Sequence, residues 1–265
     1  MSDFEPFYFI PAIFLIVLAW GSWYREAATV NPLALPFRIR VCLFAAPVVC
    51  ALVIFAVLLT LAAKDVRRDP LYVGFYQVVG IAWLGGMSLL FPFLGISMRD
   101  DVLERGHRAA LPAVCGAILG AALSFAGANV GDGPGVEAVV FSGILSGGVF
   151  FGLWFVAERL TAISEAITIE RNVGAGFRLG GSLVALGLLS GWAVAGDWVS
   201  WSATVRDVIY YSVPASVLCS VMVLVEILLR RRKPRLALGA SASIGLAFVY
   251  IAAAYGWVIL SGTHS

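Results

Sequence analysis

The sequence predicts an all-α, polytopic transmembrane bundle of about eight helices, and three observations support this fold class. Hydrophobic side chains make up 61% of the 265 residues and charged side chains only 13%, whereas a soluble domain is about 45–50% apolar and about 25% charged. The mean hydropathy is +0.94. The apolar residues gather in long uninterrupted runs rather than in short alternating segments. Because lipid offers the backbone no hydrogen-bond partner, runs of this length are expected to be helical.

Eight runs approach the roughly 20 residues that a helix needs to cross the hydrocarbon core. They cover residues 7–23, 41–63, 71–97, 109–128, 136–157, 177–196, 205–229 and 236–260. The first run is not expected to be a cleaved signal peptide, because Trp20, Trp23 and Tyr24 stand where small residues would be needed. Pro47 and Pro214 fall inside runs and predict local kinks.

The basic residues orient the predicted spans. Most Lys and Arg residues lie in the connections that follow the first, third, fifth and seventh runs, the last of these being the RRRKPR segment. The positive-inside rule places these connections in the cytoplasm and both termini on the other side. The second connection, with Lys64, Arg67 and Arg68, fits this orientation less well.

Matching markers in the second half of the chain indicate an internal repeat. They are an acid–arginine pair before each unit, a Gly-Asp pair after its first helix, and a glutamate near the end of its second helix. These residues are Glu104 with Arg105 and Glu170 with Arg171, Gly131 with Asp132 and Gly196 with Asp197, and Glu158 and Glu226. Each unit holds two spans, so the copies would enter the membrane in the same direction, as in parallel-repeat membrane proteins.

We therefore divide the chain into three parts. Residues 1–70 hold the first two spans, and residues 71–235 hold the third span and the two copies of the hairpin, 98–163 and 164–232. Residues 236–265 hold the last span.

The repeated segments resemble a known family. GISMRDDVLERGHRAA runs into a Gly-rich helix and then GANVGDGPG, and this resembles the YjfL-like bacterial inner-membrane proteins. The segment ERLTAISEAITIERNVGAGFRLGG is similar to the junction into the second unit of that family. The resemblance covers roughly residues 75–232. It implies a duplicated two-helix unit, a bacterial inner (cytoplasmic) membrane, and association with envelope-stress systems of the phage-shock type. In that membrane, the termini that the positive-inside rule places outside would be periplasmic. The resemblance implies no reaction, and the additional helices of this chain depart from the four that members generally have.

Four acids are candidates for a pathway or a structural role. Asp132 and Asp197 end equivalent helices beside glycine, where they could form a cation-attracting mouth or simply belong to tight turns. Glu158 and Glu226 lie within spans, where a carboxylate is costly and is a functional candidate by default. Each is also close to an arginine, Arg159 or Arg230, with which it could form a structural ion pair.

Two charged segments precede the repeated units and are expected to form short cytoplasmic helices that Ser97, Asp100 or Ser164 could cap. The residues are Arg99, Asp100, Asp101, Glu104, Arg105, Glu165, Glu170 and Arg171. Such mixed charge is typical of a solvated surface, and the alternative interpretation is docking of a cytoplasmic protein.

The remaining features predict packing rather than chemistry. Glycines recur at four-residue spacing, at 116/120, 143/147, 148/152 and 187/191, which favours close helix contacts within the chain, with a protein partner, or in a homo-oligomer. The four cysteines have no CxxC spacing and both histidines lie outside the spans. We therefore expect no enzyme, no cofactor, no metal and no nucleic-acid partner, but contacts with membrane lipids and with a protein partner or a second copy of the chain.

Two functions remain open at this stage. The first hypothesis is a non-enzymatic structural or accessory subunit of a membrane assembly, which predicts a solid, glycine-packed bundle. The alternative is a channel-like or transporter-like pathway for cations or small solutes, which predicts that Asp132, Asp197, Glu158 and Glu226 line a wet cavity.

Overall fold

The computed structural model describes residues 5–29, 36–231 and 238–262, and this part of the chain is an all-α bundle. Its eight helices that are long and apolar enough to cross a membrane confirm the predicted fold class. They are α1 (Glu5–Thr29), α2 (Phe37–Thr60), α4 (Pro70–Ser88), α5 (Ala110–Gly127), α6 (Val136–Thr161), α8 (Val173–Trp192), α9 with α10 (Trp201–Tyr211 and Val213–Arg231), and α11 (Ala240–Ser261).

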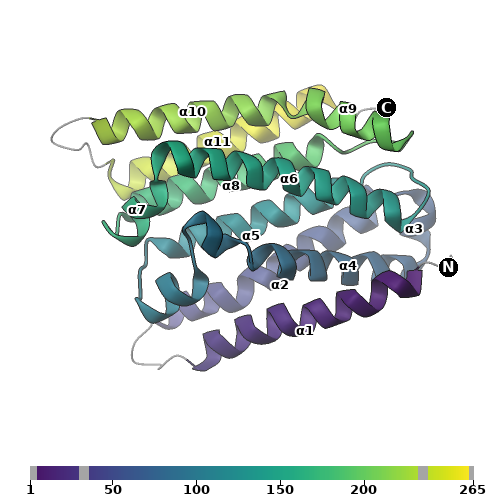
Figure 1. The fold of residues 1–265 in the computed structure, drawn as a ribbon, viewed down its shortest axis with the longest axis horizontal. Helices are drawn as coiled ribbons and strands as arrows, with labels where there is room; N and C mark the ends of the chain where they lie inside the picture. Colours follow the sequence, from purple (N-terminus) through teal and green to yellow (C-terminus); the bar gives the residue numbers. More distant parts are fainter. Residues whose placement is uncertain (1–4, 30–35, 232–237, 263–265) are drawn as a thin grey trace.

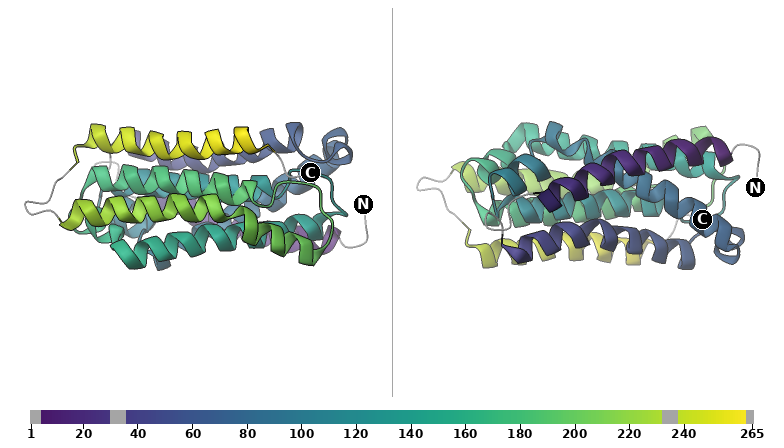
Figure 2. Two further views of the ribbon diagram at one scale, coloured as in Figure 1. Left: turned by 90° about the horizontal axis from the view of Figure 1, so that it is seen from above. Right: turned by 90° about the horizontal axis from the view of Figure 1, so that it is seen from below.

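The long helices lie side by side along one axis, so the bundle has two ends (Figures 1 and 2). The short helix α3 (Lys64–Arg68) and α9 lie at one end, together with the start of α1 and the end of α11. We call this the α3 end. The short helix α7 (Ile163–Thr168) lies at the opposite end, which we call the α7 end. The start of α1 and the end of α11 thus lie at the same end of the bundle, as an even number of spans requires.

Helices α5 and α8 form the centre of the bundle. Their apolar stretches are 72% and 78% buried, whereas those of the other six spans are at most 44% buried. Glycines explain how closely the two helices approach: a methyl group added to Gly116 would collide with the backbone of Gly180, and one added to Gly127 with that of Gly191. Without a hydrophobic force between helices in lipid, such close approach is a main source of association.

The two central helices run in parallel and keep their register over their whole length. Gly116 contacts Gly180 near the α7 end, and Gly131 contacts Gly196 in the loops beyond the α3 end. The two glycines of each contacting pair are therefore separated by nearly the same number of residues in the sequence. This number is close to the spacing between the matching markers of the predicted repeat. The duplication itself stays a prediction.

Of the glycine pairs singled out in the sequence, 116/120 and 187/191 lie in this central contact, and Gly147 packs against Trp83 of α4. Among these glycines, only at Gly148 and Gly152 of α6 would an added Cβ meet no atom within 4 Å. Most of the glycine spacing therefore serves the interior of one chain.

The third predicted span, 71–97, is too long. Helix α4 ends at Ser88 and is followed by a 3-10 turn, η1 (Phe91–Leu94), and a π-helix, η2 (Met98–Glu104). Pro92 cannot donate a backbone hydrogen bond, and Gly95 adopts a left-handed conformation with φ of 82°. Both features stop the helix although the side chains remain apolar.

The prolines behave in two ways. Helix α2 continues through Pro47, whereas the seventh span breaks at Ser212, directly before Val213 and Pro214, into α9 and α10. A kink was predicted at Pro214, and the helix is interrupted at Ser212, two residues before it. The last span begins at Ala240 rather than at 236, and residues 236–237 lie outside the described part of the chain.

We expect Gly180→Leu to prevent normal packing, because the added side chain would have to occupy the space of the Pro112 backbone. Overpacking of a tight core costs about 1–3 kcal/mol or more. Gly245→Leu is the matched control, since no atom lies within 4 Å of a Cβ at that position. Thermal unfolding in detergent would measure both; equal midpoints for the two variants would contradict a tight α5–α8 contact.

Candidate functional site

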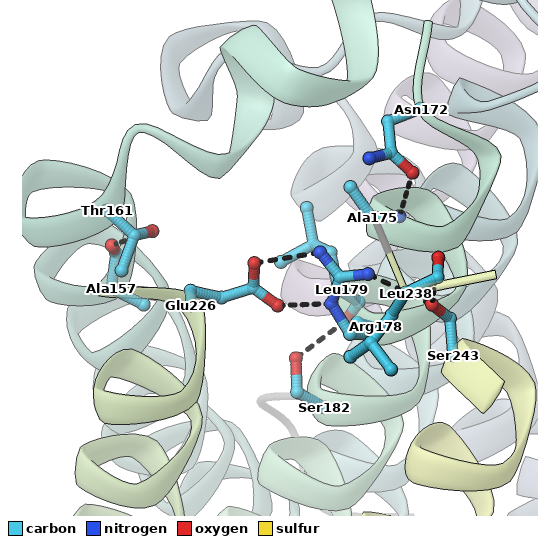
Figure 3. Close-up of polar contacts among 10 residues, drawn as sticks. All are labelled: Ala157, Thr161, Asn172, Ala175, Arg178, Leu179, Ser182, Glu226, Leu238 and Ser243. Carbon is cyan, nitrogen blue, oxygen red and sulfur yellow. Dashed lines mark hydrogen bonds and ion pairs between the residues drawn. The ribbon is translucent and has the colours of Figure 1, made fainter. Parts of the chain in front are cut away.

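A buried ion pair joins α8 to α10 near the α7 end of the bundle. Arg178 is 4% exposed and Glu226 is 1% exposed. The guanidinium Nε lies 2.5 Å from Oε1 of Glu226, and Nη2 donates to Oε2 at 2.9 Å (Figure 3). This two-point contact is the strongest geometry that an arginine and a carboxylate can adopt.

The same arginine also reaches α11. Its Nη1 donates to the hydroxyl of Ser243 at 3.0 Å (Figure 3), and Gly174 leaves so little room that a Cβ there would lie 2.5 Å from Ser243 Oγ. Arg178 therefore ties three spans together through all of its principal donor positions.

This contact shows what surrounds Glu226, one of the four predicted acids. It also identifies Arg178, which the sequence interpretation missed as a site residue. Glu226 bonds to Arg178 rather than standing alone in the membrane; the side chain of Arg230 lies outside the described residues. In the sequence, Arg178 is one of the basic residues around the connection that follows the fifth run, which we used only to orient the spans. Its position within a Gly-rich helix, six residues into α8, was the available signal. Ionisable groups buried at membrane depth pair with one another and mark positions of structural or functional importance.

Glu158 has a different environment, so it is not the equivalent of Glu226. Its carboxylate accepts hydrogen bonds from the Ser164 hydroxyl at 2.5 Å and from the Ser164 backbone N–H at 3.1 Å. The neighbouring Arg159 lies over the ring of Phe155, 5.0 Å from its centroid. Glu158 therefore holds the start of α7 in place.

The first charged segment folds around Asp101. This side chain is buried and accepts hydrogen bonds from the Ser97 N–H at 2.8 Å and from Arg105 Nη1 at 3.0 Å. Ser97 accepts from the Asp100 N–H, which confirms it as a cap. Ser164 is not one: Ala162 stands at the N-cap of α7 without a side-chain bond.

Most of the predicted docking residues lie on the surface of the α7 end. Arg99 and Glu104 pair with each other at 3.0 Å while their side chains are 61% and 55% exposed. Asp101 is the exception, because its carboxylate is used internally. The exposed members are Arg99, Asp100, Glu104, Arg105, Glu165, Glu170 and Arg171.

A buried histidine lies beneath this surface. His107 is 6% exposed, and its Nδ1 has no hydrogen-bond partner among the described residues. Burial lowers the pKa of its imidazole below the ordinary 6.5, and the positive charges of Arg171 and Arg105 act in the same direction, against the opposing effect of Asp101. The sequence placed His107 outside the spans and indicated nothing about its burial.

The α3 end contains a cavity of about 360 Å³, and the loops with Asp132 and Asp197 form part of its wall. Two hydrogen bonds join the loops: the Asp132 N–H donates to the Asp197 carboxylate at 2.8 Å, and the Trp198 N–H donates to the Asp132 carbonyl at 2.8 Å. The structure thus brings Asp132 and Asp197 together, and the Asp197 carboxylate accepts a hydrogen bond from the backbone of the other loop.

The four acids of the pathway hypothesis do not share one cavity. Asp132 and Asp197 line the cavity at the α3 end, Glu158 bonds to α7, and Glu226 bonds to Arg178. Two further acids that the sequence did not single out, Asp65 and Asp207, line the cavity instead. Among the described residues, no group of three or more His, Cys, Asp or Glu side chains is placed to hold a metal ion.

Comparison with protein-family models, curated proteins and solved structures finds no match to this chain. The resemblance to the YjfL-like family therefore stays a prediction from the quoted segments.

We expect Arg178→Met and Glu226→Leu each to lower the free energy of unfolding by about 3–5 kcal/mol, because each leaves one buried charge without its partner. The double variant should lose less than the sum, since it leaves no unpaired charge. Unfolding in mixed micelles measures this cycle. Strictly additive losses would show that the two side chains do not stabilise one another.

We expect the stability of the protein to decrease as the pH falls through 6.5, because His107 binds a proton less readily when folded than when unfolded. The neutral imidazole contributes its full stabilisation above pH 6.5. This stabilisation is lost as the pH falls from 6.5 to the lower pKa of the folded state. Melting temperatures from about pH 8 to pH 5 should show this decrease relative to His107→Gln. Parallel curves for the two proteins would rule it out.

Proposed function

We propose that this multi-pass integral membrane protein is a non-enzymatic structural or accessory subunit of a bacterial inner-membrane assembly of the envelope-stress type. The main support is the solid centre of the bundle. Backbone atoms of α5 and α8 meet at Gly116, Gly120, Gly127, Gly187 and Gly191. A pathway between these helices would require them to separate, whereas a scaffold needs no such opening.

The α7 end supplies a surface for a cytoplasmic partner. Its exposed charges of both signs come from η2, from α7 and from the residues that follow each of them. Asp101 and Glu158 fix these short helices from inside through bonds to Arg105 and Ser164. A rigid, charged surface of this kind favours a partner with complementary charges.

The lipid-facing side offers one candidate contact for a second membrane protein or a second copy. Gly148 and Gly152 are exposed on α6 with open space around them. Small residues at this spacing allow another helix to approach closely.

We expect a partner that copurifies with the wild-type protein in nanodiscs to be lost, at least about tenfold, from Glu165→Arg/Glu170→Arg, because like charges would then meet across the contact. Lys64→Glu/Arg68→Glu is the matched control, since both residues are exposed on α3 at the opposite end. Quantitative mass spectrometry of the copurified proteins is the measurement. If both variants recovered equal amounts of the partner, the partner would not bind at the α7 end.

A cation or small-solute pathway is the second candidate, supported by the acidic cavity at the α3 end. The dense α5–α8 contact argues against it. We expect liposomes with the purified protein to pass K⁺ no faster than empty liposomes. Flux that disappears in Asp132→Asn/Asp197→Asn would make the pathway the better explanation.

A further inference from the structure

The cavity at the α3 end has a wall of one charge sign. Four carboxylates line it, and they come from four different places: Asp65 on α3, Asp132 and Asp197 in the two joined loops, and Asp207 on α9. Among the described residues, no Lys or Arg lines the cavity. Lys64, Arg67 and Arg68 are exposed at the same end but are not part of the wall.

Two largely buried side chains of the same wall each have an oxygen without a hydrogen-bond partner among the described residues. Ser142 of α6 is 6% exposed, and its hydroxyl makes no hydrogen bond with any described residue. Asn129 is 5% exposed; its Nδ2 donates to the Phe125 carbonyl at 2.9 Å, while its Oδ1 receives no donor from the described residues. Both residues line the cavity, and a molecule with donor groups that enters it can bond to these two oxygens.

Aromatic rings complete the wall. Tyr72 and Tyr76 of α4, Tyr211 at the end of α9, and Trp198 all line the cavity. The faces of such rings attract cations, most strongly where water is partly excluded. Carboxylates, unsatisfied oxygens and aromatic faces are all suited to a positively charged organic molecule.

A bare metal ion fits this arrangement less well. Ca²⁺ and Mg²⁺ need several oxygen ligands within about 2.0–2.6 Å of one point, and the described acids form no such group of three. Separate carboxylates instead match a molecule that carries separate charges. An ammonium group has three donors, so a second one at the other end of a short chain can pair with a second carboxylate.

We propose that the cavity at the α3 end binds a small organic cation with two or more ammonium groups. Its ammonium groups pair with carboxylates on opposite sides of the cavity, its chain lies against the tyrosine rings, and Ser142 and Asn129 accept remaining hydrogen bonds. The site belongs to the single chain and does not depend on the proposed role as a subunit.

Calorimetric titration of the full-length protein in phosphatidylcholine nanodiscs tests the proposal. The probes are 1,4-diaminobutane, 1-aminobutane and MgCl₂. We expect saturable binding of the diamine, at least about tenfold weaker binding of the monoamine, since one ammonium group cannot reach two carboxylates, and weakening of the diamine affinity by added salt. Equal affinities for the two amines, tighter binding of Mg²⁺, or no saturable binding of the diamine would overturn it.

Matched variants locate the site. Asp132→Asn/Asp207→Asn should weaken diamine binding at least tenfold, and Ser142→Ala should weaken it several-fold. Neither carboxylate of the double variant makes a hydrogen bond within the described residues, so its melting temperature should stay close to that of the wild type. Glu137→Gln is the control, because Glu137 is an exposed acid of α6 outside the cavity wall. Unchanged binding in both site variants, or equal loss in the control, would contradict the assignment.

Discussion

The backbone contact between α5 and α8 determines where the other helices can lie. In lipid, apolar side chains gain nothing by leaving one hydrocarbon surface for another, so close van der Waals packing must hold the spans together. Gly116 and Gly180 allow the two backbones to touch, and the remaining helices pack around this pair. Phe125 of α5, for example, contacts Trp83 of α4 with ring centroids 5.7 Å apart.

The same contact extends into the loops and shapes the acidic cavity. Gly131 meets Gly196 directly beyond the helix ends, and Gly196 donates a backbone hydrogen bond to Val130 at 3.1 Å. The positive φ values of both glycines, 101° and 151°, permit this approach. Asp132 and Asp197 are thereby held side by side, and the cavity forms between their loops, α3 and α9. The close packing of α5 against α8 therefore accounts both for the tight centre of the bundle and for the position of the cavity at the α3 end.

Charges within the spans follow the cost of ionised groups in lipid. Arg178 and Glu226 are both buried and satisfy one another at two points, and Ser243 takes a further donor of the arginine. The other charged groups discussed above lie towards the two ends of the bundle, and most of them are exposed. The chemistry of the molecule is therefore concentrated at its ends: mixed charge at the α7 end, and carboxylates with aromatic rings at the α3 end.

The number of spans and the fold class could be predicted from the sequence because hydropathy and backbone hydrogen bonding act along the chain, without reference to neighbours. The Ser97 cap was also predictable, since caps are local, and Asp132 and Asp197 could be matched to each other through the repeated Gly-Asp markers. The end of α4 at Ser88, the partner of Glu226 and the burial of His107 were not predictable. These depend on which helix faces meet. In the sequence, Arg178 indicates only the predicted orientation of the spans, whereas in the structure it is enclosed by α10 and α11. Only the tertiary structure decides that, because burial and pairing are properties of contacts between segments far apart in the chain.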